Sequence, residues 1–84
     1  MEYLIDVRTP EEFSDGHYEG AIHHELLLFE DDLLPEYPTD SVIYLYCKTG
    51  LRAEKAKKIL QENKFINVVN IGGYDAQIDQ KETT

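Results

Sequence analysis

Short hydrophobic runs without polar alternation are separated along this chain by segments whose apolar residues recur at helical spacing. Residues 3–7 and 42–46 are runs rich in β-branched and aromatic residues, and residues 68–71 form a third. Runs of this kind are typical of strands that are covered on both faces, as in a parallel sheet. A weaker strand candidate, residues 21–23, follows two turn-forming glycines.

Three segments between these runs are expected to form helices. Thr9 followed by Pro10 has the pattern of an N-cap with proline at the first helical position. Residues 29–34 predict a short helix that the prolines after it stop. Residues 51–63 carry apolar residues at helical spacing, and the last turn is expected to hold three lysines: Lys57, Lys58 and Lys64.

The alternation of strands and helices in so short a chain predicts parallel strands joined by right-handed crossovers. We therefore expect an α/β fold, a three-layer sandwich with a central, mainly parallel sheet of four or five short strands flanked by helices. A chain of 84 residues leaves no room for a second domain, so residues 1–84 are expected to form one domain.

The composition excludes several classes of partner. Hydrophobic residues make up 42% of the chain, and no apolar run approaches the roughly 20 residues that span a bilayer. Acidic residues number 17 against 8 basic ones, which argues against nucleic acid or an anionic membrane as partner. The chain is expected to be soluble, monomeric and cytoplasmic, or periplasmic if a leader has been removed.

Cys47 is the only cysteine, so neither an intrachain disulfide nor a cysteine-rich zinc site can form. A lone cysteine in a small domain is usually a buried hydrophobic residue. Cys47, however, lies where the most apolar strand ends and the clearest helix begins. Ligands of open α/β sheets bind beyond the carboxyl ends of the strands, close to helix N-termini.

The loop after Cys47 has features that favour a reactive thiolate. A helix N-terminus offers unpaired N–H groups and a partial positive charge, and the thiolate is the attacking form of cysteine. Lys48 and Arg52 add positive charge, and Gly50 lets successive N–H groups turn inward as a nest. This combination predicts sulfur transfer, in which Cys47 attacks the outer sulfur of an anionic donor such as thiosulfate and becomes a persulfide. No metal or organic cofactor is expected.

Residues 47–52 resemble the active-site loop of rhodanese-like domains, in the six-residue form of thiosulfate-type sulfurtransferases. Residues 4–13 and 16–22 resemble the family's first motif and its continuation, and residues 72–76 resemble the motif near its C-terminal end. The chain thus looks like a minimal single-domain thiosulfate sulfurtransferase, a phage-shock-type small rhodanese. The resemblance implies Cys47 as the catalytic residue and a substrate-binding loop made of Lys48, Thr49, Gly50, Leu51 and Arg52.

The resemblance also implies partners for the reaction. A small anionic sulfur donor is expected to load Cys47, and cyanide, a small thiol or a thiol protein such as thioredoxin is expected to accept the sulfur. Arg52 is expected to bind the donor, with pinning of the loop as its alternative role. The chain departs from the family pattern by starting almost directly at the first motif, and by carrying Gln77 where the family often has tryptophan.

Two other functions stay open at this point. Cysteine phosphatases and arsenate reductases of related shape need a loop one residue longer, whereas four residues separate Cys47 from Arg52 and position 53 is Ala53. Rhodanese-fold binding modules without turnover commonly lack the cysteine, which this chain retains. Uptake of sulfur by Cys47 from thiosulfate or a polysulfide discriminates between these functions.

Several polar residues outside the loop are expected to have structural roles. Asp6 and Arg8 follow the first strand and are expected to form a salt bridge that braces the loops. His17 is expected to bond to nearby backbone. His23 and His24 are adjacent, so on a strand they point to opposite faces and do not share a metal ion.

Overall fold

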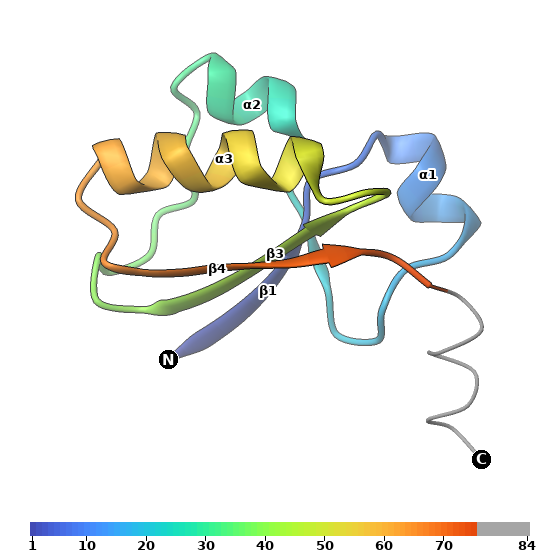
Figure 1. The fold of residues 1–84 in the computed structure, drawn as a ribbon, viewed down its shortest axis with the longest axis horizontal. Helices are drawn as coiled ribbons and strands as arrows, with labels where there is room; N and C mark the ends of the chain where they lie inside the picture. Colours follow the sequence, from blue (N-terminus) through green and yellow to red (C-terminus); the bar gives the residue numbers. More distant parts are fainter. Residues whose placement is uncertain (76–84) are drawn as a thin grey trace.

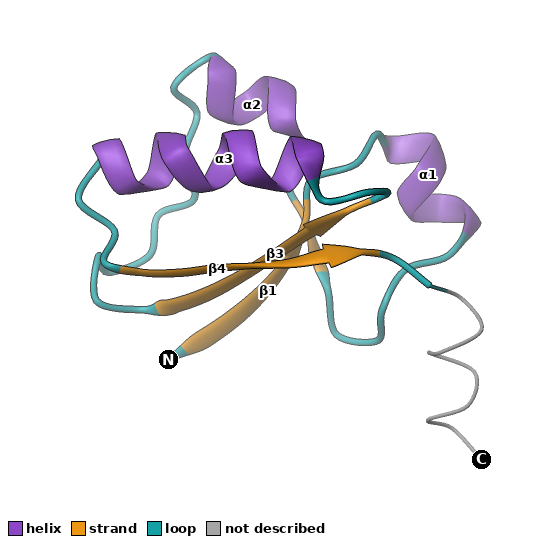
Figure 2. Cartoon of the chain, viewed as in Figure 1, coloured by secondary structure: helices purple, strands orange, loops and turns teal. Residues whose placement is uncertain are grey.

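The computed structural model of the chain describes residues 1–75, so the expectations for Ala76 and Gln77 lie outside the described residues. The four strands found within residues 1–75 are all parallel and pair in the order β2-β1-β3-β4. An α/β fold with a four-stranded parallel sheet flanked by helices is therefore confirmed (Figures 1 and 2). The elements in chain order are β1 (Glu2–Asp6), α1 (Pro10–Asp15), β2 (Ile22–His23), α2 (Leu26–Glu30), β3 (Val42–Cys47), α3 (Leu51–Glu62) and β4 (Asn67–Gly73).

The hydrophobic core lies between the sheet and the helices α2 and α3, which lie side by side over one of its faces (Figure 1). Side chains alternate between the two faces of a strand, and Ile43 and Leu45 of β3 point into this core. On the opposite face Leu4, Tyr44 and Val69 are neighbours in register, half-buried or exposed. The core residues are Ile5, Val7, Phe29, Ile43, Leu45, Cys47, Ala53, Ala56, Leu60, Phe65 and Val68.

Helix α1 begins as the sequence predicts. The Thr9 hydroxyl accepts a hydrogen bond from the Glu12 N–H at 3.3 Å, and the Glu12 carboxylate accepts one from the Thr9 N–H at 3.0 Å. This reciprocal capping box, with Pro10 at the start of the helix, satisfies donors that would otherwise be unpaired. It also fixes the position of the Glu12 carboxylate, which becomes important at the functional site.

The prediction for the second helix is wrong in its bounds, because α2 covers Leu26–Glu30 instead of residues 29–34. The helix starts earlier because the Leu26 N–H donates to the Val7 carbonyl at 3.0 Å, a contact with the chain beyond β1 that no local signal encodes. It ends earlier because Asp32 adopts a φ of 60° and the Leu33 N–H donates back to the Leu28 carbonyl at 2.8 Å. The prolines therefore lie in the long loop to β3.

Helix α3 ends one residue earlier than predicted, and the expectation of lysines in its last turn is wrong. Lys57 and Lys58 precede the last turn, whereas Lys64 lies beyond the helix with a φ of 73°. This left-handed residue turns the chain back, so that the Phe65 N–H donates to the Leu60 carbonyl at 3.1 Å. Burial of the Phe65 side chain in the core thus decides where the helix stops.

The carboxyl ends of the parallel strands meet at one edge of the sheet. In Figure 1 the arrowheads of β3 and β4 point toward this edge, and α1 lies beyond it. The chain leaves β1 toward β2 on one side and leaves β3 toward β4 on the other, so the β1/β3 boundary is a topological switch point. Ligands of open α/β sheets bind at such a boundary. Within the described residues, no helix is long and apolar enough to cross a membrane.

Candidate active site

Cys47 ends β3 directly below the first turn of α3, and its side chain has no exposed area. Its Sγ atom accepts hydrogen bonds from the backbone N–H groups of Gly50, at 3.0 Å, and Ala53, at 3.4 Å. Gly50 has φ 96° and ψ -15°, a left-handed conformation that suits glycine and turns its N–H toward the sulfur. Two main-chain donors at a helix N-terminus stabilise negative charge on Sγ.

The glycines at the end of β4 allow the loop to lie this close to the sheet. A Cβ atom at Gly73 would overlap the carbonyl group of Lys48, and a Cβ atom at Gly50 would come 3.3 Å from the Gly72 Cα. The Tyr74 N–H donates to the Cys47 carbonyl at 2.8 Å, which attaches the two strand ends to each other. The segment of residues 72–75 therefore supports the cysteine loop from below.

Asn70 is a supporting residue that the sequence analysis missed. Its Nδ2 donates to the Gly50 carbonyl at 2.9 Å and to the Glu54 carboxylate at 3.1 Å, while its Oδ1 accepts from the Gly72 N–H at 2.9 Å. Asn70 thus connects β4, the cysteine loop and α3. A polar residue inside the hydrophobic run of β4 was the available signal.

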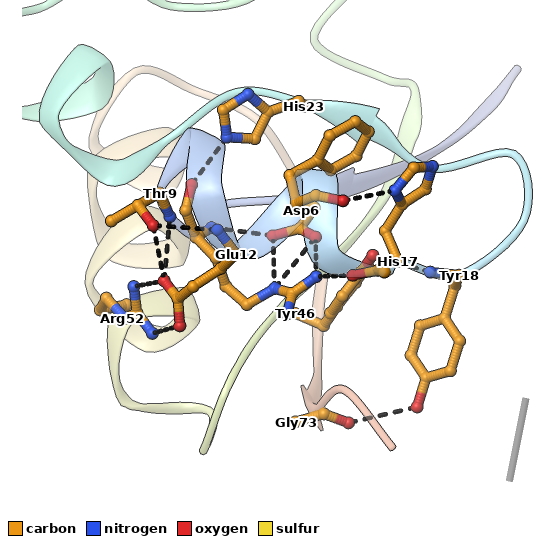
Figure 3. Close-up of polar contacts among 12 residues, drawn as sticks. Asp6, Thr9, Glu12, His17, Tyr18, His23, Tyr46, Arg52 and Gly73 are labelled. Atoms are coloured by element: carbon orange, nitrogen blue, oxygen red, sulfur yellow. Dashed lines mark hydrogen bonds and ion pairs between the residues drawn. The ribbon is translucent and has the colours of Figure 1, made fainter. Parts of the chain in front are cut away.

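The Arg52 side chain forms an ion pair with Glu12, 40 residues earlier (Figure 3). Its two terminal nitrogens lie 2.7 Å and 3.0 Å from the two Glu12 carboxylate oxygens. Hydrogen bonding from Arg52, aided by the Thr9 backbone and hydroxyl groups, lowers the pKa of Glu12 to about 2 despite the opposing effect of burial. The side chains of Arg52 and Glu12 are 32% and 29% exposed, so the pair remains open to solvent.

The other predicted loop residues present their side chains to solvent. Lys48, Thr49 and Leu51 are exposed, and these side chains make no hydrogen bond within residues 1–75. The N–H groups of Leu51 and Arg52 open the first turn of α3, where no preceding helical carbonyl is available. The loop therefore brings backbone donors around Cys47, with Lys48 and Arg52 as the nearby cations.

A cavity of about 180 Å³ lies beside the loop, between α2 and the segment that follows β1. Val7 and Thr9 line it from that segment, Leu26 and Glu30 from α2, and Arg52 from α3. The cavity therefore lies beyond the carboxyl end of β1, and Arg52 connects its lining to the cysteine loop. Within the described part of the chain, no cluster of three His, Cys, Asp or Glu side chains could hold a metal ion.

The expected ion pair between Asp6 and Arg8 is present, and both side chains are buried. Arg8 Nη2 lies 2.6 Å from Asp6 Oδ2 and donates to the Gly16 carbonyl, also at 2.6 Å (Figure 3). The guanidinium carbon lies 4.7 Å from the centre of the Tyr74 ring. Arg8 thereby connects the end of β1 with the segment after β4.

His17 makes the backbone contact that the sequence predicts, and His23 and His24 each contact a backbone carbonyl as well. His17 Nδ1 lies 2.8 Å from the Phe13 carbonyl oxygen, and the two rings stack (Figure 3). His23 Nε2 lies 2.7 Å from the Arg8 carbonyl oxygen, and His24 Nε2 lies 2.7 Å from the Leu33 carbonyl oxygen. None of these three ring contacts involves Cys47.

Comparisons with known proteins agree on one family. The model of the rhodanese-like domain matches residues 1–79. Thiosulfate sulfurtransferase PspE of Escherichia coli (strain K12) is 34% identical over 73 residues, which are 86% of this chain and 70% of PspE. YqhL of Bacillus subtilis (strain 168) is 37% identical over 70 residues, but the match spans only 55% of YqhL. Among solved structures, a rhodanese with anions from E. coli has a TM-score of 0.77 at 34% identity, covering 87% of each chain.

Proposed function

The chain belongs to the rhodanese-like domain family, and we propose that it is a sulfurtransferase that carries a sulfur atom on Cys47 as a persulfide. The observation that supports this most directly is the pair of N–H groups, from Gly50 and Ala53, that donate to Sγ at the N-terminus of α3. PspE, the relative named as a thiosulfate sulfurtransferase, makes thiosulfate the first donor to test.

In the loading step, the Cys47 thiolate attacks the outer sulfur of thiosulfate. The bond from Sγ to the outer sulfur forms as the bond between the two thiosulfate sulfurs breaks, and sulfite leaves with that electron pair. The negative charge moves from Sγ to the outer sulfur of the new persulfide. Main-chain donors suit this step, because they stabilise the charge without needing to reorganise during the reaction.

In the unloading step, a thiolate or cyanide attacks the outer sulfur of the persulfide. The acceptor gains that sulfur, the bond to Sγ breaks, and its electron pair returns to Cys47 as the thiolate. Both steps move one sulfur atom between nucleophiles, so no external oxidant or reductant is consumed. Polysulfides are alternative donors that undergo the same displacement.

We assign the loop residues two kinds of role in binding the donor. Gly50 gives its N–H to the sulfur, and the first-turn N–H groups of Leu51 and Arg52 are placed to receive an anion. Lys48 and Arg52 supply positive charge beside Cys47, and Thr49 belongs to the exposed segment between β3 and α3. Because Cys47 is buried, entry of the donor requires this segment to move.

The test is a sulfur-transfer assay on the wild type and on Cys47→Ser, with thiosulfate, a polysulfide and a phosphate ester as parallel substrates. We expect thiosulfate or polysulfide to add the mass of one sulfur atom to the wild type, and cyanide or a thiol to remove it. Cys47→Ser is expected to have no activity. A wild type that gains no sulfur from either donor, or a variant that keeps its activity, would overturn the proposal.

A further inference from the structure

The basic residues of this acidic chain are concentrated around α3. Between residues 1 and 47 there are 12 acidic residues and a single arginine. The segment from residue 48 to residue 64 holds two acidic residues, Glu54 and Glu62, and six of the chain's eight basic residues. These six are Lys48, Arg52, Lys55, Lys57, Lys58 and Lys64.

Part of this segment forms an exposed stripe on the outer side of α3. Leu51, Lys55 and Lys58 are spaced four and three residues apart, so they lie on one face of the helix, and all three are exposed. Leu51 is a large hydrophobic residue with 74% of its surface in contact with solvent. Together with Lys48, which is exposed just before the helix, they are called the basic stripe below.

No lysine of the basic stripe forms an ion pair within residues 1–75. The ion pairs among the described residues join Asp6 to Arg8 and Glu12 to Arg52, and neither involves a lysine. Of the two acidic residues in the segment, Glu54 accepts a hydrogen bond from Asn70 at 3.1 Å, whereas Glu62 is exposed one turn after Lys58 on the same face of the helix. The three lysines outnumber Glu62, so this face keeps a net positive charge that is available to another molecule.

The basic stripe starts at the functional site. Leu51 lies between Gly50 and Ala53, the two residues whose N–H groups donate to Cys47 Sγ. From Leu51 to Lys58 the helix rises about 10 Å, at roughly 1.5 Å per residue. A small donor or acceptor occupies only the loop, whereas a partner that contacts the whole stripe must be a larger molecule.

We propose that the basic stripe docks an acidic segment of a thiol protein that exchanges sulfur with Cys47. This proposal rests on the proposed function and names the class of its macromolecular partner. Acidic side chains pair with Lys48, Lys55 and Lys58, while Leu51 provides an apolar contact beside the reacting sulfurs. The acidic remainder of the chain repels any polyanion that extends beyond α3, so a compact acidic segment fits better than a nucleic acid.

The chemistry at the docked site is a thiol exchange. The anionic Cys47 persulfide first takes up a proton from water. The partner thiolate then attacks its outer sulfur, and a new sulfur–sulfur bond forms on the partner as the bond to Sγ breaks. Its electron pair returns to Cys47, and the partner leaves as a persulfide that keeps the proton. Docking raises the rate of encounter and leaves the chemical step unchanged.

The experiment compares peptides that carry one cysteine flanked by Glu, by Gln or by Lys, with dithiothreitol as a small acceptor. Each reacts with the preformed Cys47 persulfide at low and at high ionic strength. We expect the Glu peptide to react fastest and the Lys peptide slowest, with the difference lost at high salt. Reversing charge in Lys55→Glu/Lys58→Glu is expected to lower the rate for the Glu peptide, relative to dithiothreitol, by about tenfold.

The matched control is Lys57→Glu/Lys64→Glu, which changes the net charge equally but lies off the stripe. It is expected to keep the wild-type ratio between Glu peptide and dithiothreitol. Equal rates for the three peptides at low salt, or the same loss in both double variants, would overturn the docking proposal while leaving the proposed function intact. Tighter binding of a short RNA than of the Glu peptide would also overturn it.

If no persulfide forms, the proposed function fails, and docking is then measured by binding alone. The probe is a Glu peptide in which serine replaces the cysteine, and its affinity is compared between the wild type and the two double variants. Weaker binding by Lys55→Glu/Lys58→Glu only would support the basic stripe, and equal binding by all three proteins would reject it.

Discussion

At the scale of single residues, the environment of Cys47 is made mainly by backbone groups. The donors that reach Sγ are the N–H groups of Gly50 and Ala53, and both are main-chain groups. Arg52 is the loop residue whose side chain is committed elsewhere, because it pairs with Glu12 through both terminal nitrogens. The attraction of the site for an anion therefore depends on whether the Arg52 guanidinium group pairs with Glu12 or with the bound anion.

This competition predicts that substitutions of Arg52 and of Glu12 change KM for thiosulfate in opposite directions. Arg52→Ala removes a cation from the mouth of the site, and we expect KM to rise by about tenfold, the loss of one charge-assisted hydrogen bond. Glu12→Gln frees the guanidinium group for the donor, and KM is expected to fall. Steady-state kinetics with thiosulfate and cyanide measure both values.

Arg52→Lys, which keeps the charge without the paired geometry, is the control for these variants and is expected to lie between wild type and Arg52→Ala. If Arg52 only holds the loop in place, both Arg52→Ala and Glu12→Gln will instead lower kcat and leave KM unchanged.

The ion pair also predicts how stability depends on pH. Arg52 lowers the pKa of Glu12 from 4.5 to about 2, so the folded state favours the ionised carboxylate. This stabilisation is present above pH 4.5 and is lost as the pH falls toward 2. Because the pair is partly exposed, we expect Glu12→Gln to cost about 1 kcal/mol of unfolding free energy at neutral pH.

Urea unfolding of wild type and Glu12→Gln at a series of pH values measures this contribution. The difference between the two proteins should shrink below pH 4.5 and vanish near pH 2. A difference that is constant over this range would mean that the ion pair does not contribute to stability.

At the scale of elements, the cysteine loop depends on the strand beside it. β4 ends in two glycines, and the backbone of the loop after β3 lies close against them. Asn70 joins the Gly50 carbonyl to β4, and Tyr74 joins the Cys47 carbonyl to the segment after it. The position of the backbone donors around Sγ is therefore set jointly by β3, α3 and β4.

Substitution of the two glycines separates steric contact from backbone strain. In Gly73→Ala the new methyl group overlaps the Lys48 carbonyl and must displace the loop, so we expect kcat/KM to fall by about a hundredfold, the effect of a misplaced catalytic group. Gly72→Ala meets no atom within 4 Å but is strained by a φ of 98°. It is expected to lose about 1 kcal/mol of stability and to keep most of its activity.

Thermal unfolding and sulfur-transfer rates, measured on both variants, distinguish the two effects. If Gly73→Ala and Gly72→Ala lose activity in proportion to stability, the loop does not depend on close contact with Gly73.

At the scale of the whole molecule, the parallel topology brings distant motifs to one edge. The segments after β1 and β3 and the end of β4 come from three parts of the sequence, and the buried ion pair of Asp6 with Arg8 lies at the end of β1. An anion held by this edge contacts groups from more than one element. Binding should therefore stabilise the whole fold, because only the folded chain assembles the site.

We expect thiosulfate to raise the Tm of Cys47→Ser, which can bind the anion without reacting. At a thiosulfate concentration about 100 times Kd, the free energy of unfolding is expected to rise by roughly 2.7 kcal/mol. Thermal unfolding measures this rise, with sodium chloride of equal ionic strength as the control. Cys47→Ser/Arg52→Ala is expected to need more thiosulfate for the same gain. If sodium chloride raises the Tm equally, the salt only screens the net charge of -9, and thiosulfate does not bind at a specific site.

The sequence by itself determined the strands, the starts of α1 and α3 and the cysteine loop between β3 and α3. These depend on local signals: continuous apolar runs, the capping box of Thr9 and Glu12, and a glycine before a helical pattern. The tertiary structure alone decided the bounds of α2, the left-handed turn at Lys64, and the contacts of Asn70 and Arg52 with the rest of the site. The physical reason is separation along the chain. Such contacts join residues up to 40 positions apart, and no window of neighbouring residues encodes which of them will meet once the sheet has formed.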